Sequence, residues 1–193
     1  MGFACGGRSR PPAVTTEPGR TEGFFLGSLR GLGRGLQTLP RPAFVLLTLA
    51  WFAWIGHLSS GPIELDTPLP FGSFLTNLAH APLFGLAALW VCWALARREE
   101  PFPWPRIQVG SALFVIGIVA FYGALDEWHQ STVPERSACW LDAVTDTTAA
   151  ACVVWTVHAV GAANRSERRT RLILVACVLA CCLAAAAATA FCA

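Results

Sequence analysis

The sequence predicts an all-α integral membrane protein with five transmembrane helices. Of its 193 residues, 54% are hydrophobic and only 13% are charged, and the apolar residues gather into long runs. A soluble domain usually carries about 25% charged residues. A helix needs about 20 residues to cross the hydrocarbon core of a bilayer, whereas a barrel strand needs about 10 with alternating polarity. Because the apolar runs are long and do not alternate, we expect helices rather than strands.

The chain begins with a segment, residues 1–40, that is rich in Arg, Gly and Pro and has no apolar run before Gly23. We predict that this tail is mostly disordered and lies in the cytoplasm. Within it, apolar and basic residues fall on separate helical stripes, which suits a helix lying on an anionic membrane surface. Several glycines weaken such a helix, so a surface-bound arm and a flexible linker are both open. The apolar stripe consists of Phe25, Leu29, Leu32 and Leu36.

Five apolar segments follow the tail and are the predicted transmembrane helices. The fourth is the least apolar, because Asp142, Asp146 and several threonines interrupt its first half, so packed neighbours must shield that half. The fifth carries no ionisable group and is rich in alanine, which is typical of a helix that packs closely against others. An Arg-rich loop, residues 161–171, separates the fourth from the fifth. The segments span residues 43–58, 75–96, 107–125, 139–160 and 172–192.

The placement of arginine predicts the orientation of the chain. All 14 basic residues are Arg, and thirteen of them precede the first segment or lie in the loops after the second and fourth segments. The two other loops carry only Arg136. Since basic residues accumulate on the cytoplasmic side, the N-terminus is predicted inside and the C-terminus outside. We therefore expect a multi-pass protein of the cell membrane.

Several other residues have structural interpretations. The eight cysteines form no Cys-x-x-Cys pair and most lie inside the predicted helices, so we expect them to pack as small hydrophobic residues. Trp104, Trp128 and Trp140 are predicted to lie at the membrane interface, with stacking on a ligand as the alternative. His57 is expected at a helix end, and His158 at a helix boundary on the cytoplasmic side.

The predicted topology brings together polar residues that are far apart in the sequence. Four segments place such residues within about two helical turns of the outer boundary. An acidic residue inside a bilayer costs about 2.5–3.5 kcal/mol, so we interpret the group as a functional pocket. An internal polar network that holds the bundle together is the alternative. The residues are His57 from the first segment, Asn77 and His80 from the second, Asp126 and Glu127 from the third, and Asp142 and Asp146 from the fourth.

The residues around this pocket form a long motif. It reads Tyr122-Gly123-x-x-Asp126-Glu127-x-His129-Gln130-x-x-Val133-Pro134-x-Arg136, and Asp142 follows. The motif resembles the signature of the VanZ-like membrane protein family, and Ser59-Ser60-x-Pro62 with His80 is similar to the family's first hairpin. The resemblance covers about residues 43–160. It implies a VanZ-like four-helix bundle, to which this chain adds a further C-terminal helix in residues 172–193.

The resemblance also has functional implications. The namesake of the family is linked to low-level resistance to the glycopeptide teicoplanin, which implies a role in the bacterial cell envelope. Two departures make this pocket more acidic than the family pattern, because Glu135 stands in place of a glycine and Asp146 in place of an asparagine. A bound cation would compensate this additional negative charge.

Three classes of function are open. The favoured one is binding of the polar part of an amphiphile at the outer leaflet, with Arg136 meeting a phosphate or carboxylate. This amphiphile would be a lipid-linked envelope precursor or a lipophilic glycopeptide. The second class is catalysis by a hydrolase or transferase, and the third is an ion or proton pathway. The expected partners are therefore membrane lipids and such an amphiphile, with no nucleic acid, while enzymatic activity and oligomeric state are not predicted.

The candidate site residues follow from these classes. No cofactor is evident, but a divalent metal ion remains a candidate, because ligands gathered from separate helices show no local spacing. Asp126 and Asp142 are the expected central carboxylates, and Arg136 is expected to pair with Asp142 or to meet the ligand. The candidate ligand-binding residues are His80, Asp126, Glu127, Gln130, Arg136, Asp142 and Asp146, and the candidate catalytic residues are Asp126, Glu127, His129 and Asp142.

Overall fold

The computed structural model describes residues 24–61, 71–95, 104–134, 136, 138–162 and 166–192. Every regular element in these residues is an α-helix. Helices α2 to α6 are each long and apolar enough to cross a membrane, which confirms the five predicted apolar helices. The helices are α1 (Phe24–Gln37), α2 (Arg41–Ser59), α3 (Gly72–Leu95), α4 (Val109–Gln130), α5 (Trp140–Gly161) and α6 (Glu167–Cys192).

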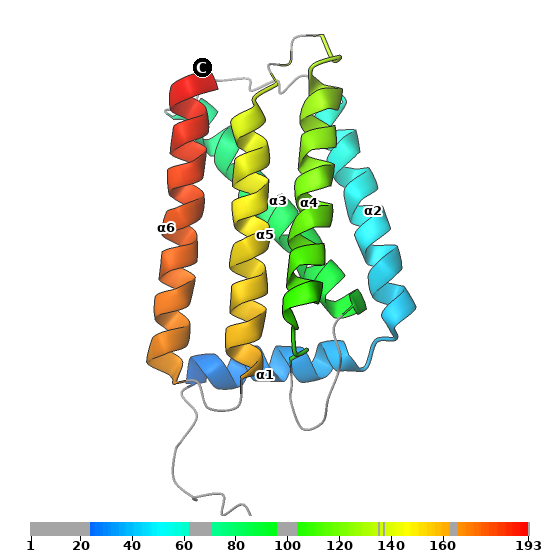
Figure 1. Cartoon of the computed structure of the whole chain (residues 1–193), viewed down its shortest axis with the longest axis vertical. Helices are drawn as coiled ribbons and strands as arrows, with labels where there is room; N and C mark the ends of the chain where they lie inside the picture. The colour runs from blue at the N-terminus through cyan, green and yellow to red at the C-terminus, as the bar shows by residue number, and fades with distance from the viewer. Residues whose placement is uncertain are drawn as a thin grey trace, which may run out of the picture.

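The five long helices run between two ends of the molecule (Figure 1). Helices α2, α4 and α6 finish where α3 and α5 begin, and we call this the carboxylate end because it holds Asp126 and Asp142. The opposite end holds Arg41, Arg106 and Arg168, and we call it the arginine end. Helix α1 lies crosswise over the arginine end (Figure 1).

Helices α3 and α5 form the centre of the bundle, and each packs against both α4 and α6. Helix α3 runs diagonally behind the other long helices (Figure 1). Phe44 of α2 stacks on Trp93 of α3, with 5.5 Å between the ring centroids. Large apolar side chains such as Leu46, Leu113 and Leu183 are exposed along the bundle. Such extensive exposed apolar surface is expected where a protein contacts lipid.

Helix α1 lies in the part of the tail for which the sequence leaves a surface-bound helix and a flexible linker both open. Phe24–Gln37 is helical, which agrees with a helix rather than a linker, and Leu26 is buried. Trp104 donates its indole N–H to the Leu29 carbonyl oxygen at 2.8 Å, which holds α1 against the arginine end of the bundle. Trp104 is itself buried, so it belongs to the core rather than to an interfacial belt. Leu29 and Leu36 of the predicted apolar stripe pack against the core, whereas Leu32 is exposed. Residues 1–23 lie outside the described residues.

Two cysteines also depart from the prediction. Cys139, just before α5, and Cys192, at the end of α6, form a disulfide with 5.8 Å between their Cα atoms. The sequence could not indicate this pair, because 53 positions separate the two residues and only the packing of α5 against α6 brings them together. Cys152 and Cys177 follow the prediction and pack between the same two helices, each thiol donating to the other's carbonyl oxygen.

Candidate functional site at the carboxylate end

A buried cluster of ionisable side chains lies at the carboxylate end. His80 of α3, Glu127 of α4 and Asp142 of α5 offer ligand atoms that all lie within 4.8 Å of one another. Glu127 is 1% exposed and Asp142 is 6% exposed. Three central helices therefore each contribute one group to a space that lipid and water scarcely reach. We call His80, Glu127, Asp142 and the adjoining Asp146 the acidic cluster.

Asp146 holds the His80 ring from the far side. The distance from His80 Nδ1 to Asp146 Oδ1 is 3.1 Å, and Asp146 has no exposed surface. With Asp146 ionised, its carboxylate can only accept a hydrogen bond, and Nδ1 would then carry the proton in this pair. In the neutral imidazole the lone pair then lies on Nε2, which is free to meet a ligand.

The start of α5 fixes Glu127 and Asp142. The backbone N–H of Cys139 donates to Glu127 Oε2 at 2.6 Å, so the residue that caps α5 also holds a side chain of α4. Asp142 lies in the first turn of α5, where the helix dipole favours a negative charge. The disulfide of Cys139 anchors the same turn to α6.

Each carboxylate of the cluster keeps one oxygen without a partner. Glu127 Oε1, Asp142 Oδ1 and Asp146 Oδ2 are buried and have no hydrogen-bond partner among the described residues. A buried polar atom left unsatisfied costs about 1–3 kcal/mol, and more when it is charged. Three such atoms in one place require a physical reason, since native proteins satisfy most buried polar groups.

Two motif residues allow α4 to approach its neighbours. A Cβ atom at position 123 would lie 2.6 Å from Asp146 Oδ2, so only glycine there leaves room for the carboxylate against α4. Tyr122 donates its hydroxyl to the Phe52 carbonyl oxygen at 2.5 Å and stacks on the Phe52 ring, which ties α4 to α2. The Tyr122-Gly123 pair of the motif therefore has a structural explanation.

A second group of predicted site residues faces α2 instead of the cluster. Asp126 accepts a hydrogen bond from Gln130 Nε2 at 2.8 Å, and His129 Nε2 lies 3.2 Å from Ser60 Oγ. Beside them is a hollow of about 420 Å³, which we call the α2–α4 hollow. Its lining residues are Gly56, Ser60, Tyr122, Leu125, Asp126, Trp128 and His129.

Two expected members do not join the acidic cluster. Arg136 donates from Nη2 to the Leu58 carbonyl oxygen at 3.2 Å, and in the described part of the chain it makes no ion pair with Asp142. The expected Asp142–Arg136 pair is therefore not formed, because the loop carries Arg136 over the end of α2. Asn77 points to α6, where its side-chain N–H donates to Thr189 Oγ1 at 3.1 Å. Glu135 lies outside the described residues.

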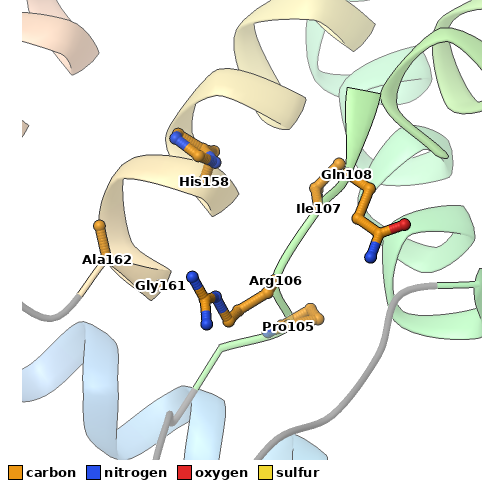
Figure 2. A pocket seen from close by; sticks show the side chains of 7 residues that line it. All are labelled: Pro105, Arg106, Ile107, Gln108, His158, Gly161 and Ala162. Carbon is orange, nitrogen blue, oxygen red and sulfur yellow. The ribbon is translucent and has the colours of Figure 1, made fainter. Parts of the chain in front are cut away.

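The other histidines occupy the positions expected for helix boundaries. His57 is exposed in the last turn of α2, with its ring centroid 5.6 Å from that of Trp54. His158 is exposed in the last turn of α5, at the arginine end. Figure 2 shows it beside a hollow of about 320 Å³ between α5 and the segment that leads into α4. None of the described residues that line this hollow is acidic, so their chemistry differs from that of the carboxylate end.

Comparisons with known proteins add no further identification. No family model, no curated protein and no solved structure matches this chain.

Proposed function

We propose that this chain is a multi-pass protein of a cell membrane, with its N-terminus in the cytoplasm and the carboxylate end facing outward. The concentration of arginine at one end supports this orientation. The disulfide between Cys139 and Cys192 supports it independently, because disulfides persist in oxidising compartments and this one lies at the carboxylate end.

We propose further that the carboxylate end binds the polar head of a membrane amphiphile. The observation that carries this proposal is the α2–α4 hollow, which combines polar and apolar walls at the level where a lipid headgroup would lie. Asp126, His129 and Ser60 supply hydrogen-bonding groups for hydroxyls. Trp128 is 60% exposed and adjoins this wall, so its ring is available to cover an apolar face of a ligand.

Arg136 extends the hollow with a positive charge. Its guanidinium group bonds the Leu58 carbonyl oxygen, two residues before Ser60, so it lies near the same rim. A guanidinium group pairs bidentately with phosphate. Hydroxyl-binding groups beside an arginine suit a lipid-linked sugar phosphate, the chemistry of an envelope precursor. A VanZ-like assignment, and with it a role in the bacterial envelope or in teicoplanin-type resistance, remains a proposal that rests on the motif residues.

Binding measured in lipid nanodiscs tests this function. A polyprenyl diphosphate sugar should bind the full chain saturably, and Trp128→Ala and Arg136→Ala should each weaken binding by about tenfold or more, equivalent to about 1.4 kcal/mol. Trp155→Ala and Arg168→Ala are the matched controls, since Trp155 is exposed on α5 outside the hollow and Arg168 is exposed at the arginine end. Equal affinity in all four variants would remove the hollow as the binding site. Binding of a lipophilic glycopeptide but not of the sugar lipid would identify the alternative ligand.

Catalysis is the second candidate function, and the acidic cluster favours it. A histidine held by a carboxylate next to two further acids can transfer protons or activate water. Hydrolysis of the diphosphate bond in the same sugar lipid, in which water adds across the P–O–P linkage to give polyprenyl phosphate and a sugar phosphate, would reveal such an activity. Glu127→Gln should abolish it, and Glu167→Gln should keep it.

An ion or proton pathway has less support. In the described part of the five long helices, no acidic, basic or histidine residue occurs over residues 42–56, 81–95, 109–125, 147–157 or 172–192. Along α5, Asp146 and His158 are about 18 Å apart at a rise of about 1.5 Å per residue. A proton would therefore have no acidic, basic or histidine side chain of α5 to occupy along this distance.

A further inference from the structure

We propose that His80, Glu127 and Asp142 bind a divalent first-row transition-metal ion, and that Asp146 positions His80 for it. This inference is independent of the proposed binding of an amphiphile, because it concerns the buried acidic cluster and not the α2–α4 hollow.

The distances suit one shared ion. Two ligand atoms on opposite sides of an ion lie about 4.2 Å apart at zinc-type bond lengths and about 4.8 Å apart at the longer calcium-type bond lengths. The ligand atoms of His80, Glu127 and Asp142 all lie within 4.8 Å of one another. At zinc-type bond lengths, any separation above about 4.2 Å would have to shorten by at most about 0.6 Å for the three atoms to share one ion.

The unpartnered oxygens give the second, independent argument. Glu127 and Asp142 are more than nine-tenths buried, and each has an oxygen with no hydrogen-bond partner among the described residues. Three carboxylates face one imidazole here, and Arg136, the one arginine in the two loops at this end, bonds a backbone carbonyl instead. Buried charges in proteins are paired or coordinate metals. A divalent ion would neutralise the cluster and satisfy the orphan oxygens together.

The donor set indicates the class of metal. An imidazole nitrogen suits Zn²⁺, Fe²⁺ and similar ions, whereas Ca²⁺ and Mg²⁺ prefer oxygen ligands alone. One nitrogen and two carboxylates leave coordination positions for water or for a substrate, as in catalytic rather than structural zinc sites. We therefore assign a transition-metal ion with an open position rather than a closed structural site.

Asp146 has the place of an outer-shell ligand. Histidines that bind metals usually donate their second ring N–H to a carboxylate, which fixes the tautomer and raises the basicity of the metal-binding nitrogen. The contact of 3.1 Å between His80 Nδ1 and Asp146 Oδ1 is of this kind, and it leaves Nε2 for the ion. Asp146 is thus a positioning residue.

The test uses the full chain, purified in mild detergent without an affinity tag and stripped with a chelator. Mn²⁺ is the first probe, because thiols such as those of Cys92, Cys152 and Cys177 prefer softer ions. Loss of the electron paramagnetic resonance signal of aqueous Mn²⁺ should show one ion per chain, and Zn²⁺ should displace it. Absence of saturable binding by the folded wild-type chain overturns the proposal, and tighter binding of Ca²⁺ or Mg²⁺ than of Mn²⁺ overturns the assigned class.

Variants locate the site. Glu127→Gln and Asp142→Asn should each lower Mn²⁺ affinity by more than about 100-fold, and Asp146→Asn by about 10–100-fold, the range for outer-shell partners. Glu167→Gln, the same change at the arginine end, should bind as the wild type does. Affinities unchanged in Glu127→Gln and Asp142→Asn would overturn the proposed ligands.

Stability supplies a readout that does not depend on the affinities. Ion-free Asp142→Asn should unfold at a higher temperature than the ion-free wild type, because it removes an uncompensated buried charge. It should also lose the rise in Tm that Mn²⁺ gives the wild type. A purely structural network predicts the reverse, with Asp142→Asn less stable in every condition. Loss of sugar-lipid binding with metal binding intact would remove the proposed function alone, so the two failures are distinguishable.

Discussion

The two ends of the bundle differ in how far their charged side chains are exposed. At the arginine end, Arg168 and His158 are exposed, and Arg171, whose side chain is 62% exposed, pairs with Glu167, whose side chain is 19% exposed. At the carboxylate end, Glu127 and Asp146 are buried and keep oxygens without partners in the described part of the chain. Solvated charges cost little and can be exchanged, whereas buried acids reduce stability unless something compensates them. The buried acids of the carboxylate end are therefore the better candidates for function, because their cost needs an explanation and that of the exposed arginines does not.

The largest effect on stability is expected from removing the disulfide between Cys139 and Cys192 at the carboxylate end. Replacing Cys139 and Cys192 by serine should lower the free energy of unfolding by about 2–4 kcal/mol, because the cross-link restricts the unfolded chain. The same change should weaken Mn²⁺ binding, since the Cys139 N–H holds Glu127. Denaturant titration in detergent measures the change in stability. Loss of the electron paramagnetic resonance signal of aqueous Mn²⁺ measures the change in Mn²⁺ binding.

Cys182→Ser is the control for this experiment, because Cys182 is a free thiol of α6. It should leave both measurements unchanged. If the double variant lost stability but bound Mn²⁺ with wild-type affinity, the disulfide would stabilise the bundle without organising the acidic cluster.

The next effect comes from overpacking at Gly123. Gly123→Ala should cost about 1–3 kcal/mol of stability, the range for an added methyl group in a packed interior. The new Cβ atom would meet the Asp146 carboxylate, so Mn²⁺ affinity should fall as well. Gly117→Ala, on an open face of the same helix, should lack both effects. A well-bound ion in Gly123→Ala would mean that Asp146 can move without releasing His80.

The fold could be predicted from the sequence because lipid imposes a simple rule. Length and apolarity are sufficient to identify a membrane-crossing helix, and α2 to α6 all follow this rule. Helix α1 is not one of the five long apolar helices. It is held by the hydrogen bond from Trp104 to the Leu29 carbonyl oxygen, and these two residues are distant in sequence. A stripe on a helix with four glycines could not reveal that contact.

The site could be predicted only in part, for a similar reason. Topology alone places His80, Asp126, Glu127 and Asp142 at one end, but it does not determine which way each residue faces. Neighbouring residues of α4 point to different places, so Glu127 joins the cluster while Asp126 lines the α2–α4 hollow. The hydrogen bond from the Cys139 backbone N–H to Glu127 could not be predicted from residue types, because any residue except proline offers an N–H.

A smaller effect is expected where α4 is tied to α2. Tyr122→Phe removes the hydroxyl that donates to the Phe52 carbonyl oxygen and should cost about 0.5–1.5 kcal/mol, the net value of a typical hydrogen bond. The ring stacking on Phe52 remains, so the fold should be kept. Thermal unfolding in detergent measures the loss. Because Tyr122 lines the hollow and not the acidic cluster, sugar-lipid affinity should fall while Mn²⁺ affinity stays constant.

The smallest effect is expected at the arginine end, and it tests the other half of the comparison. Glu167→Gln removes the partner of Arg171 in a surface pair one helical turn apart. Such pairs contribute about 0.3–0.5 kcal/mol, and Arg171 is 62% exposed, so solvent replaces most of the lost interaction. Thermal unfolding should show a small difference between wild type and variant at low salt, and this difference should become smaller still in 1 M salt, because salt screens the pair. A loss as large as that of Gly123→Ala would contradict the view that charges at this end are readily exchanged, because it would show that α6 depends on this pair for its place in the bundle.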